Sequence, residues 1–295
     1  MSMQLQPGED PAEAARAILR KQIKAAIGEL GDDDKRSAEA DVHGARKQLK
    51  RARAILRLLR DALDDDEYRA ANTELRDAAR PLSQVRDSEV LQEVLDGVVK
   101  RAGEEAKQLR LEKLQNGFKR QRAHLRQTAA DRKQLANVQE SLRRVDRRAQ
   151  KWTFDGSGWP VLESGLKRIY RRGRKAVATA HSQPTTENLH EWRKQVKYLW
   201  HQLQALEPLS PGIIGELADE MHALSSYLGD DHDLAVLRER VCEPASGLDE
   251  HSAAALQSMI DRRREELRGK AFALGERLYS DTPKAFAGRL RELMR

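Results

Sequence analysis

The 295-residue sequence has a single cysteine, Cys242, so it predicts neither an intrachain disulfide nor a cysteine-based zinc site. No apolar run is long enough to cross a bilayer, and residues 1–10 lack the apolar core of a signal peptide. These absences indicate a cytoplasmic protein that has no membrane partner. We expect it to begin with a disordered tail over residues 1–9.

The sequence also lacks the local motifs of the common enzyme classes. It contains no Gly-x-x-x-x-Gly-Lys-Ser/Thr phosphate loop, no Gly-x-Ser-x-Gly elbow and no His-Glu-x-x-His zinc motif. Three acidic residues surround His232, at positions 230, 231 and 233, but successive helical positions diverge by about 100°. We therefore expect these side chains to cap a helix or form ion pairs with the basic helices. No catalytic residue, metal site or cofactor is predicted.

Charged residues are abundant, at 34% of the chain, with 54 Lys and Arg against 47 Asp and Glu. This composition is typical of amphipathic helices. No segment alternates polar and apolar residues as a strand does. The predicted fold class is therefore all-α.

Two segments, residues 42–50 and 189–197, share the pattern apolar-His-x-x-Arg-Lys-x-x-Lys. On a helix, each segment has an apolar side and a basic side. The apolar sides comprise Val42, Ala45, Leu49, Ala52, Leu56, Leu59 and Leu63, and Leu189, Trp192, Val196, Leu199, Leu203 and Leu206. The first basic strip comprises His43, Arg46, Lys47, Lys50 and Arg57 with Arg51 and Arg53 at its edges, and the second comprises His190, Arg193, Lys194, Lys197 and His201.

Each basic strip is about 15–20 Å long at the helical rise of about 1.5 Å per residue, which suits an extended polyanion better than one phosphate. A solvated helix face usually mixes charges, whereas no acidic residue occurs between Val42 and Arg60. Neighbouring helices carry further outward cations, which we include as candidate ligand contacts: Arg20, Lys24, Arg171, Arg172 and Lys175. His43 and His190 could add charge, donate a hydrogen bond as neutral rings, or bridge two helices.

The two motifs belong to an internal repeat. His43 and His190 are 147 residues apart, and the segments 82–91 and 228–237 resemble one another, which pairs Asp87 with Asp233. The turn-rich segment 152–160 separates the copies. We expect one domain over residues 10–295, with repeat one at about 10–151, a linker at about 152–160 and repeat two at about 161–295. Pro81 is expected to split a helix in the first copy.

The duplicated motif resembles the CHAD domain, the conserved-histidine α-helical domain, over almost the whole chain. The resemblance implies two four-helix bundles related by a pseudo-twofold axis around a basic groove or pore that binds inorganic polyphosphate. The groove would be lined by His43, Arg46, Lys47, Lys50, Arg51, Arg53, His190, Arg193, Lys194 and Lys197. The second copy departs from the family pattern at Trp200 and His201, where Arg and Tyr are common. No Glu-x-Glu-x-Lys strand motif is present, so a stand-alone member is implied.

We therefore expect a non-enzymatic protein that binds polyphosphate electrostatically and more weakly as salt rises. The resemblance further implies a location at cytoplasmic polyphosphate or polyester granules. Three alternatives stay open: a nucleic-acid-binding protein, a metal-dependent polyphosphate hydrolase and an interaction scaffold. No specific nucleic-acid partner is expected, because aromatic residues are only 4% of the chain and no recognition motif is found.

Overall fold

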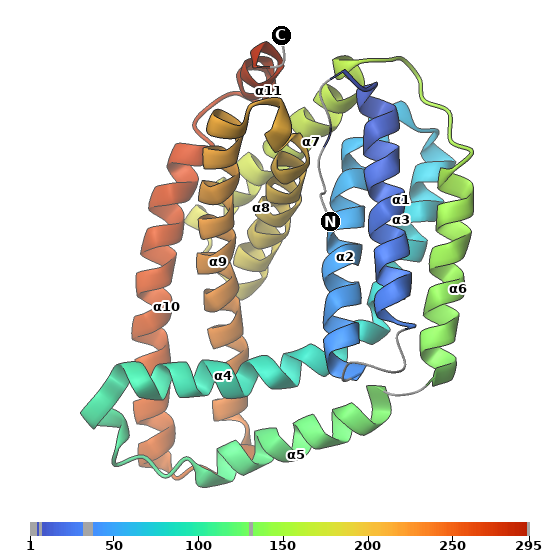
Figure 1. Ribbon diagram of the computed structural model, residues 1–295. Helices are drawn as coiled ribbons and strands as arrows, with labels where there is room; N and C mark the ends of the chain where they lie inside the picture. Colours follow the sequence, from blue (N-terminus) through green and yellow to red (C-terminus); the bar gives the residue numbers. More distant parts are fainter. Residues whose placement is uncertain (1–4, 6–7, 32–37, 130–131, 294–295) are drawn as a thin grey trace.

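The computed structural model describes residue 5 and residues 8–31, 38–129 and 132–293. These residues form eleven α-helices and no strand, which confirms the all-α fold class. Two groups of upright helices stand side by side (Figure 1). One group contains α1 (Pro11–Glu29), α2 (Ala38–Leu58), α3 (Asp65–Ala79) and α6 (Arg132–Ala149). The other contains α7 (Trp159–Ser182), α8 (Thr186–Leu206), α9 (Pro211–Cys242) and α10 (Glu250–Leu278).

The remaining helices join these groups. α4 (Gln84–Ala102) and α5 (Glu112–Ala129) lie across the lower part of the molecule, where α4 crosses α9 and α10, whereas the short α11 (Pro283–Glu292) packs on α7 (Figure 1). Two four-helix groups are thus present, and α4 and α5 connect them.

Local sequence signals explain where several helices begin and end. The Asp10 carboxylate caps α1 by accepting from the backbone N–H of Ala12 at 3.0 Å and of Glu13 at 3.1 Å. Thr185 caps α8 by accepting from the N–H of Asn188 at 3.2 Å. Pro81 begins a 3-10 turn between α3 and α4, so the predicted split at this proline is confirmed.

One predicted boundary was wrong: the aspartates at 64–66 were expected to end the helix that carries the first basic strip. The helix with the first basic strip ends at Leu58 rather than near residues 64–66, because Asp64 instead caps α3 by accepting from the N–H of Asp66 at 2.9 Å. The charged segment from about 104 to 151 contains two helices, α5 and α6.

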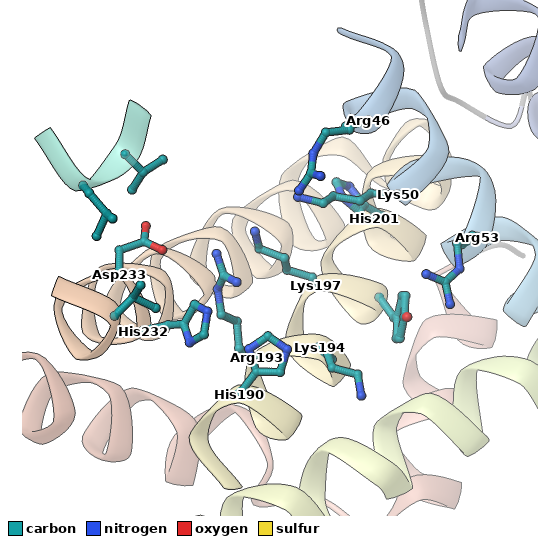
Figure 2. Close-up of a pocket in the computed structure, with 14 residues that line it drawn as sticks. Arg46, Lys50, Arg53, His190, Arg193, Lys194, Lys197, His201, His232 and Asp233 are labelled. Atoms are coloured by element: carbon teal, nitrogen blue, oxygen red, sulfur yellow. The ribbon is translucent and has the colours of Figure 1, made fainter. Parts of the chain in front are cut away.

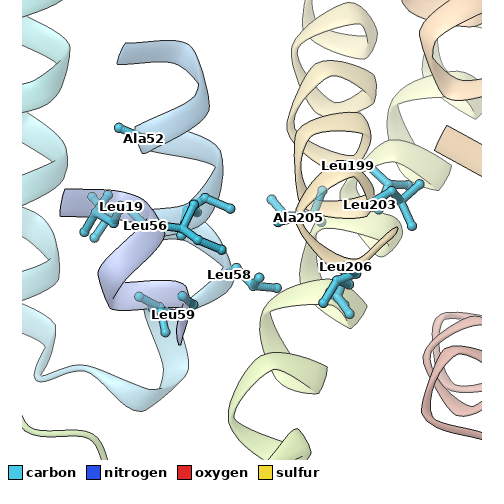
Figure 3. Packing of buried hydrophobic residues seen from close by; sticks show 14 of the residues in the cluster. Leu19, Ala52, Leu56, Leu58, Leu59, Leu199, Leu203, Ala205 and Leu206 are labelled. Atoms are coloured by element: carbon cyan, nitrogen blue, oxygen red, sulfur yellow. The ribbon is translucent and has the colours of Figure 1, made fainter. Parts of the chain in front are cut away.

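The apolar sides of both motif helices are buried, as predicted, in one core that runs through both groups. Figure 3 shows Leu58 and Ala205 between α2 and α8, with Leu19 and Leu56 on the α1 side. The side-chain N–H of Gln202 donates to the carbonyl oxygen of Ala54 at 3.0 Å and joins the two helices near their C-terminal ends. α2 and α8 therefore meet at these ends.

A second core lies where α4 and α5 pack on the other group. Leu91, Leu95 and Val98 of α4 and Leu114 and Phe118 of α5 form one cluster with apolar residues of α9 and α10. The first half of the chain therefore supplies part of the core under the second half.

Leu5 is the one residue of positions 1–7 that the structure describes. The Leu5 side chain is 2% exposed, and its N–H donates to the carbonyl oxygen of Ala205 at 2.8 Å. At this point the N-terminal segment contacts the second half of the molecule.

Candidate polyanion-binding site

A cavity of about 530 Å³ opens between α2 and α8, on the N-terminal side of the contact between Ala54 and Gln202. α4 and α9 complete its wall. Its lining residues are Arg46, Lys50 and Arg53 of α2; Val90 and Leu91 of α4; His190, Arg193, Lys194, Lys197, Tyr198 and His201 of α8; and His232, Asp233 and Val236 of α9.

The lining is strongly cationic. Arg46 and Lys50 on α2 and Arg193 and Lys197 on α8 point into the same space (Figure 2). Of the described residues that line the cavity, six are Lys or Arg and one, Asp233, is acidic. Guanidinium groups can bind two phosphate oxygens at once, and ammonium groups add compact positive charge. This lining suits a polyanion.

The structure brings eight of the predicted binding residues together in the cavity. They come from both basic strips: Arg46, Lys50, Arg53, His190, Arg193, Lys194, Lys197 and His201. The two motif helices therefore converge on one space. The convergence is unequal, because His190 lines the cavity and the exposed His43 does not.

Other predicted residues lie outside the cavity. In the first basic strip, Lys47 is exposed, Arg51 is half-buried, and the Arg57 guanidinium covers the Tyr198 ring at 4.1 Å from its centroid. Burial lowers the pKa of both arginines from their usual value. Arg57 thus packs on Tyr198, which lines the cavity, without lining the cavity itself.

The outward cations of α1 and α7 are also elsewhere. Arg20 lies outside the cavity and forms an ion pair with Asp146 of α6 at 2.8 Å, because α6 packs on α1 and supplies its counter-charge. Lys24 and Arg171 are exposed. Arg172 and Lys175 line a separate hollow of about 250 Å³ together with Glu191.

Two of the three histidines that line the cavity, His190 and His201, differ from simple cations. Burial, reinforced by His232 and Arg193, lowers the pKa of His190 to about 4. Burial also lowers the pKa of His201 to about 4, and its Nδ1 lies 3.0 Å from the Oε1 of Gln204, to which it donates. At neutral pH both rings are therefore uncharged in the free protein.

The prediction of the site missed several residues, chiefly Tyr198, His232 and Asp233. Tyr198 follows Lys197, the last residue of the second motif, and belongs to neither the apolar side nor the basic strip that the pattern predicts. His232 and Asp233 belong to the acidic cluster for which capping or ion pairing was predicted. Asp87, which the repeat pairs with Asp233, has a side chain outside the described residues.

Ion pairing in the acidic cluster is confirmed for Asp231, whose partners are arginines of α10. The buried Asp231 carboxylate accepts from Arg264 at 3.1 Å and from Arg268 at 3.0 Å, both on α10. Within the described residues, no group of three or more His, Cys, Asp or Glu side chains is arranged to hold a metal ion. No helix in the described part is long and apolar enough to cross a membrane.

Comparisons with known proteins agree with this architecture. The family model of the CHAD domain matches residues 17–242. No curated protein matches the chain. The structure is similar to that of PptA from Streptomyces chartreusis, with a TM-score of 0.65 and 12% sequence identity over 92% of this chain and 100% of that chain. It is also similar to the CHAD domain from the plant Ricinus communis, with a TM-score of 0.55 and 15% identity over 99% of this chain and 95% of that chain.

Proposed function

Because this chain belongs to the CHAD domain family, which is associated with polyphosphate binding, we propose that its basic cavity binds inorganic polyphosphate without converting it. The observation that carries the proposal is the convergence of cations from α2 and α8 on one cavity with a single described carboxylate. Like charges held this close repel one another, and a bound polyanion removes that repulsion. Binding in this way requires no reaction.

Exposed cations outside the cavity supply further contacts to chains that are longer than the cavity can hold. His43 and Lys47 lie on α2 beside the cavity, and Arg172 and Lys175 line the neighbouring hollow on the far side of Glu191. Arg171 and Lys24 extend the positive surface. These contacts are solvated and therefore individually weak.

The recessed position of the cations favours polyphosphate over the alternatives. A nucleic-acid duplex requires cations on an open surface that follows its backbone, whereas six of the cations here line a cavity of about 530 Å³. A metal-dependent hydrolase requires several acidic metal ligands at the scissile bond. Among the described residues, the lining supplies Asp233 alone.

The test is charge reversal at the cavity. Lys50→Glu and Lys197→Glu are each expected to weaken the binding of long-chain polyphosphate by about 10- to 100-fold, since each brings a negative charge against the phosphates. Isothermal titration calorimetry at two salt concentrations measures the loss, and parental binding should weaken as salt rises. Lys284→Glu, on the exposed start of α11 and outside the cavity, makes the same change in net charge and should bind nearly as the parent does.

Equal losses in Lys284→Glu and Lys50→Glu would show that net charge, not the cavity, governs binding. Displacement of polyphosphate by duplex DNA at equal phosphate concentration would favour the nucleic-acid alternative. Phosphate release that depends on Mg²⁺ or Mn²⁺ would identify an enzyme. We also propose a cytoplasmic, granule-associated location; a fluorescent fusion should lose its granule signal in the Lys50→Glu variant.

A further inference from the structure

His190 on α8 and His232 on α9 meet at the wall of the cavity, with ring centroids 4.6 Å apart and ring planes 49° apart. The Nδ1 atoms of both rings are shielded from solvent and make no hydrogen bond within the described residues. A buried polar atom without a partner is costly unless a ligand or water satisfies it. The shielded Nδ1 atoms cannot themselves meet a ligand, but both rings line the cavity and can contact one through their open edges.

Neither ring favours a proton in the free protein. The pKa of His232 is lowered by burial and then by Arg193, with Asp231 opposing that effect. The pKa of His190 is lowered to about 4 by burial first and by His232 next. The described charged groups that face the pair are Arg193, Lys194, Lys197 and Glu191 of α8, Asp231 and Asp233 of α9, Arg264 of α10, and Arg46 and Lys50 of α2, while α4 contributes Val90 and Leu91.

We propose, on the basis of the polyphosphate-binding function above, that His190 and His232 together form a proton-coupled phosphate contact that takes up a proton when the polyanion enters the cavity. His232 is then a ligand-binding residue that lies outside both duplicated motifs. The cavity gains positive charge only when an anion is present. The free protein thereby avoids a further cation among the six that already line the cavity.

The direction of the pH dependence follows from the charges. An anionic phosphate beside an imidazole raises its pKa, because the opposite charge favours the protonated ring. Between pH about 4 and the higher pKa of the complex, the complex holds more protons than the free protein. Polyphosphate binding therefore strengthens as the pH falls through that window, by about tenfold per pH unit for each proton taken up.

The test is calorimetry of the full-length protein with long-chain polyphosphate at pH 6, in two buffers with different ionisation enthalpies. The difference in observed heat gives the number of protons bound, and we expect an uptake of about one proton per cavity. Affinities measured from pH 5 to pH 8 should rise as the pH falls. The His190→Gln/His232→Gln double variant should take up no proton at this site and show a flatter profile. His251→Gln, an exposed histidine of α10 outside the cavity, should keep the parental uptake.

Uptake that is absent in the parent, or unchanged in the double variant, would overturn the proton-coupled contact and leave polyphosphate binding intact. Failure of the parent to bind polyphosphate at any pH would instead overturn the proposed function. If the double variant does not fold, the parent protein alone provides a second test. The NMR resonances of its histidine rings are titrated with pH in the presence and absence of polyphosphate. Higher pKa values for His190 and His232 in the complex support the proposal, and unchanged values overturn it.

Discussion

Arg20 and Lys50 carry the same charge on neighbouring helices, yet only Lys50 lines the cavity. The difference comes from the neighbour across each helix: Asp146 of α6 lies 2.8 Å from Arg20, whereas Lys50 faces the space between α2 and α8. Sequence periodicity gives the direction of a side chain relative to its own helix. It does not give the residue that a distant segment places opposite, so the ion pair between Arg20 and Asp146 could not have been predicted from the pattern.

His201 provides a prediction about pH and stability. Its pKa in the folded protein is lowered to about 4 by burial, against an ordinary value of 6.5, so the unfolded chain binds more protons between these values. The free energy of unfolding should therefore fall as the pH drops from about 7 to about 4, with a contribution from His201 on the order of 3 kcal/mol. His201→Asn, which retains a donor toward Gln204, should show a shallower decline in urea denaturation measured across that range. An equal decline in parent and variant would contradict this assignment.

At the scale of whole helices, local chemistry was enough to predict most of the fold. The caps at Asp10 and Thr185, the split at Pro81 and the two buried apolar sides were all predictable, because each depends on residues within a few turns. The packing partner of each helix was not, because it depends on contacts between distant segments. Gln202, for example, is a polar residue that belongs to neither predicted side, yet it is buried against Ala54, since α2 covers that end of α8.

The close approach of α7 to α2 depends on Gly165. A methyl group at this position would lie 2.1 Å from the carbonyl oxygen of Leu58, which is backbone and cannot rotate away. We expect Gly165→Ala to lower the free energy of unfolding by about 2–3 kcal/mol through overpacking. Gly269→Ala in α10, where a methyl group meets nothing within 4 Å, should instead raise it by about 0.5–1 kcal/mol. Urea denaturation measures both, and a neutral Gly165→Ala would show that the two helices are farther apart than described.

At the scale of the molecule, one proline changes how the two halves are built. Aligned on their histidine motifs, the long helix α9 of 32 residues corresponds to α3 and α4 together, which Pro81 separates. The separated α4 turns across the molecule and packs on α9, where Val90 and Leu91 also close the cavity. The sequence predicted the split but not the crossing, because the direction of α4 depends on the apolar surface that α9 and α10 offer to it.

This crossing predicts that the halves remain together when the chain between them is cut. A protease site placed in the exposed stretch 155–157 would separate α1–α6 from α7–α11 covalently. We expect both fragments to elute together in size-exclusion chromatography without denaturant, because α4 and α5 of one fragment share a core with α9 and α10 of the other. Separation of the fragments in native buffer would contradict the shared core.

The matched variant is Leu95→Ala/Phe118→Ala, cut at the same site. Both side chains are buried in the shared core, and each truncation removes about 2–5 kcal/mol of packing free energy. The cut variant should therefore dissociate at a lower urea concentration than the cut parent. The uncut variant should lose less resistance to urea than the cut variant does, since the intact linker keeps the halves at a high effective concentration. Dissociation should also abolish polyphosphate binding, because α2 of one fragment and α8 of the other both supply cations to the cavity.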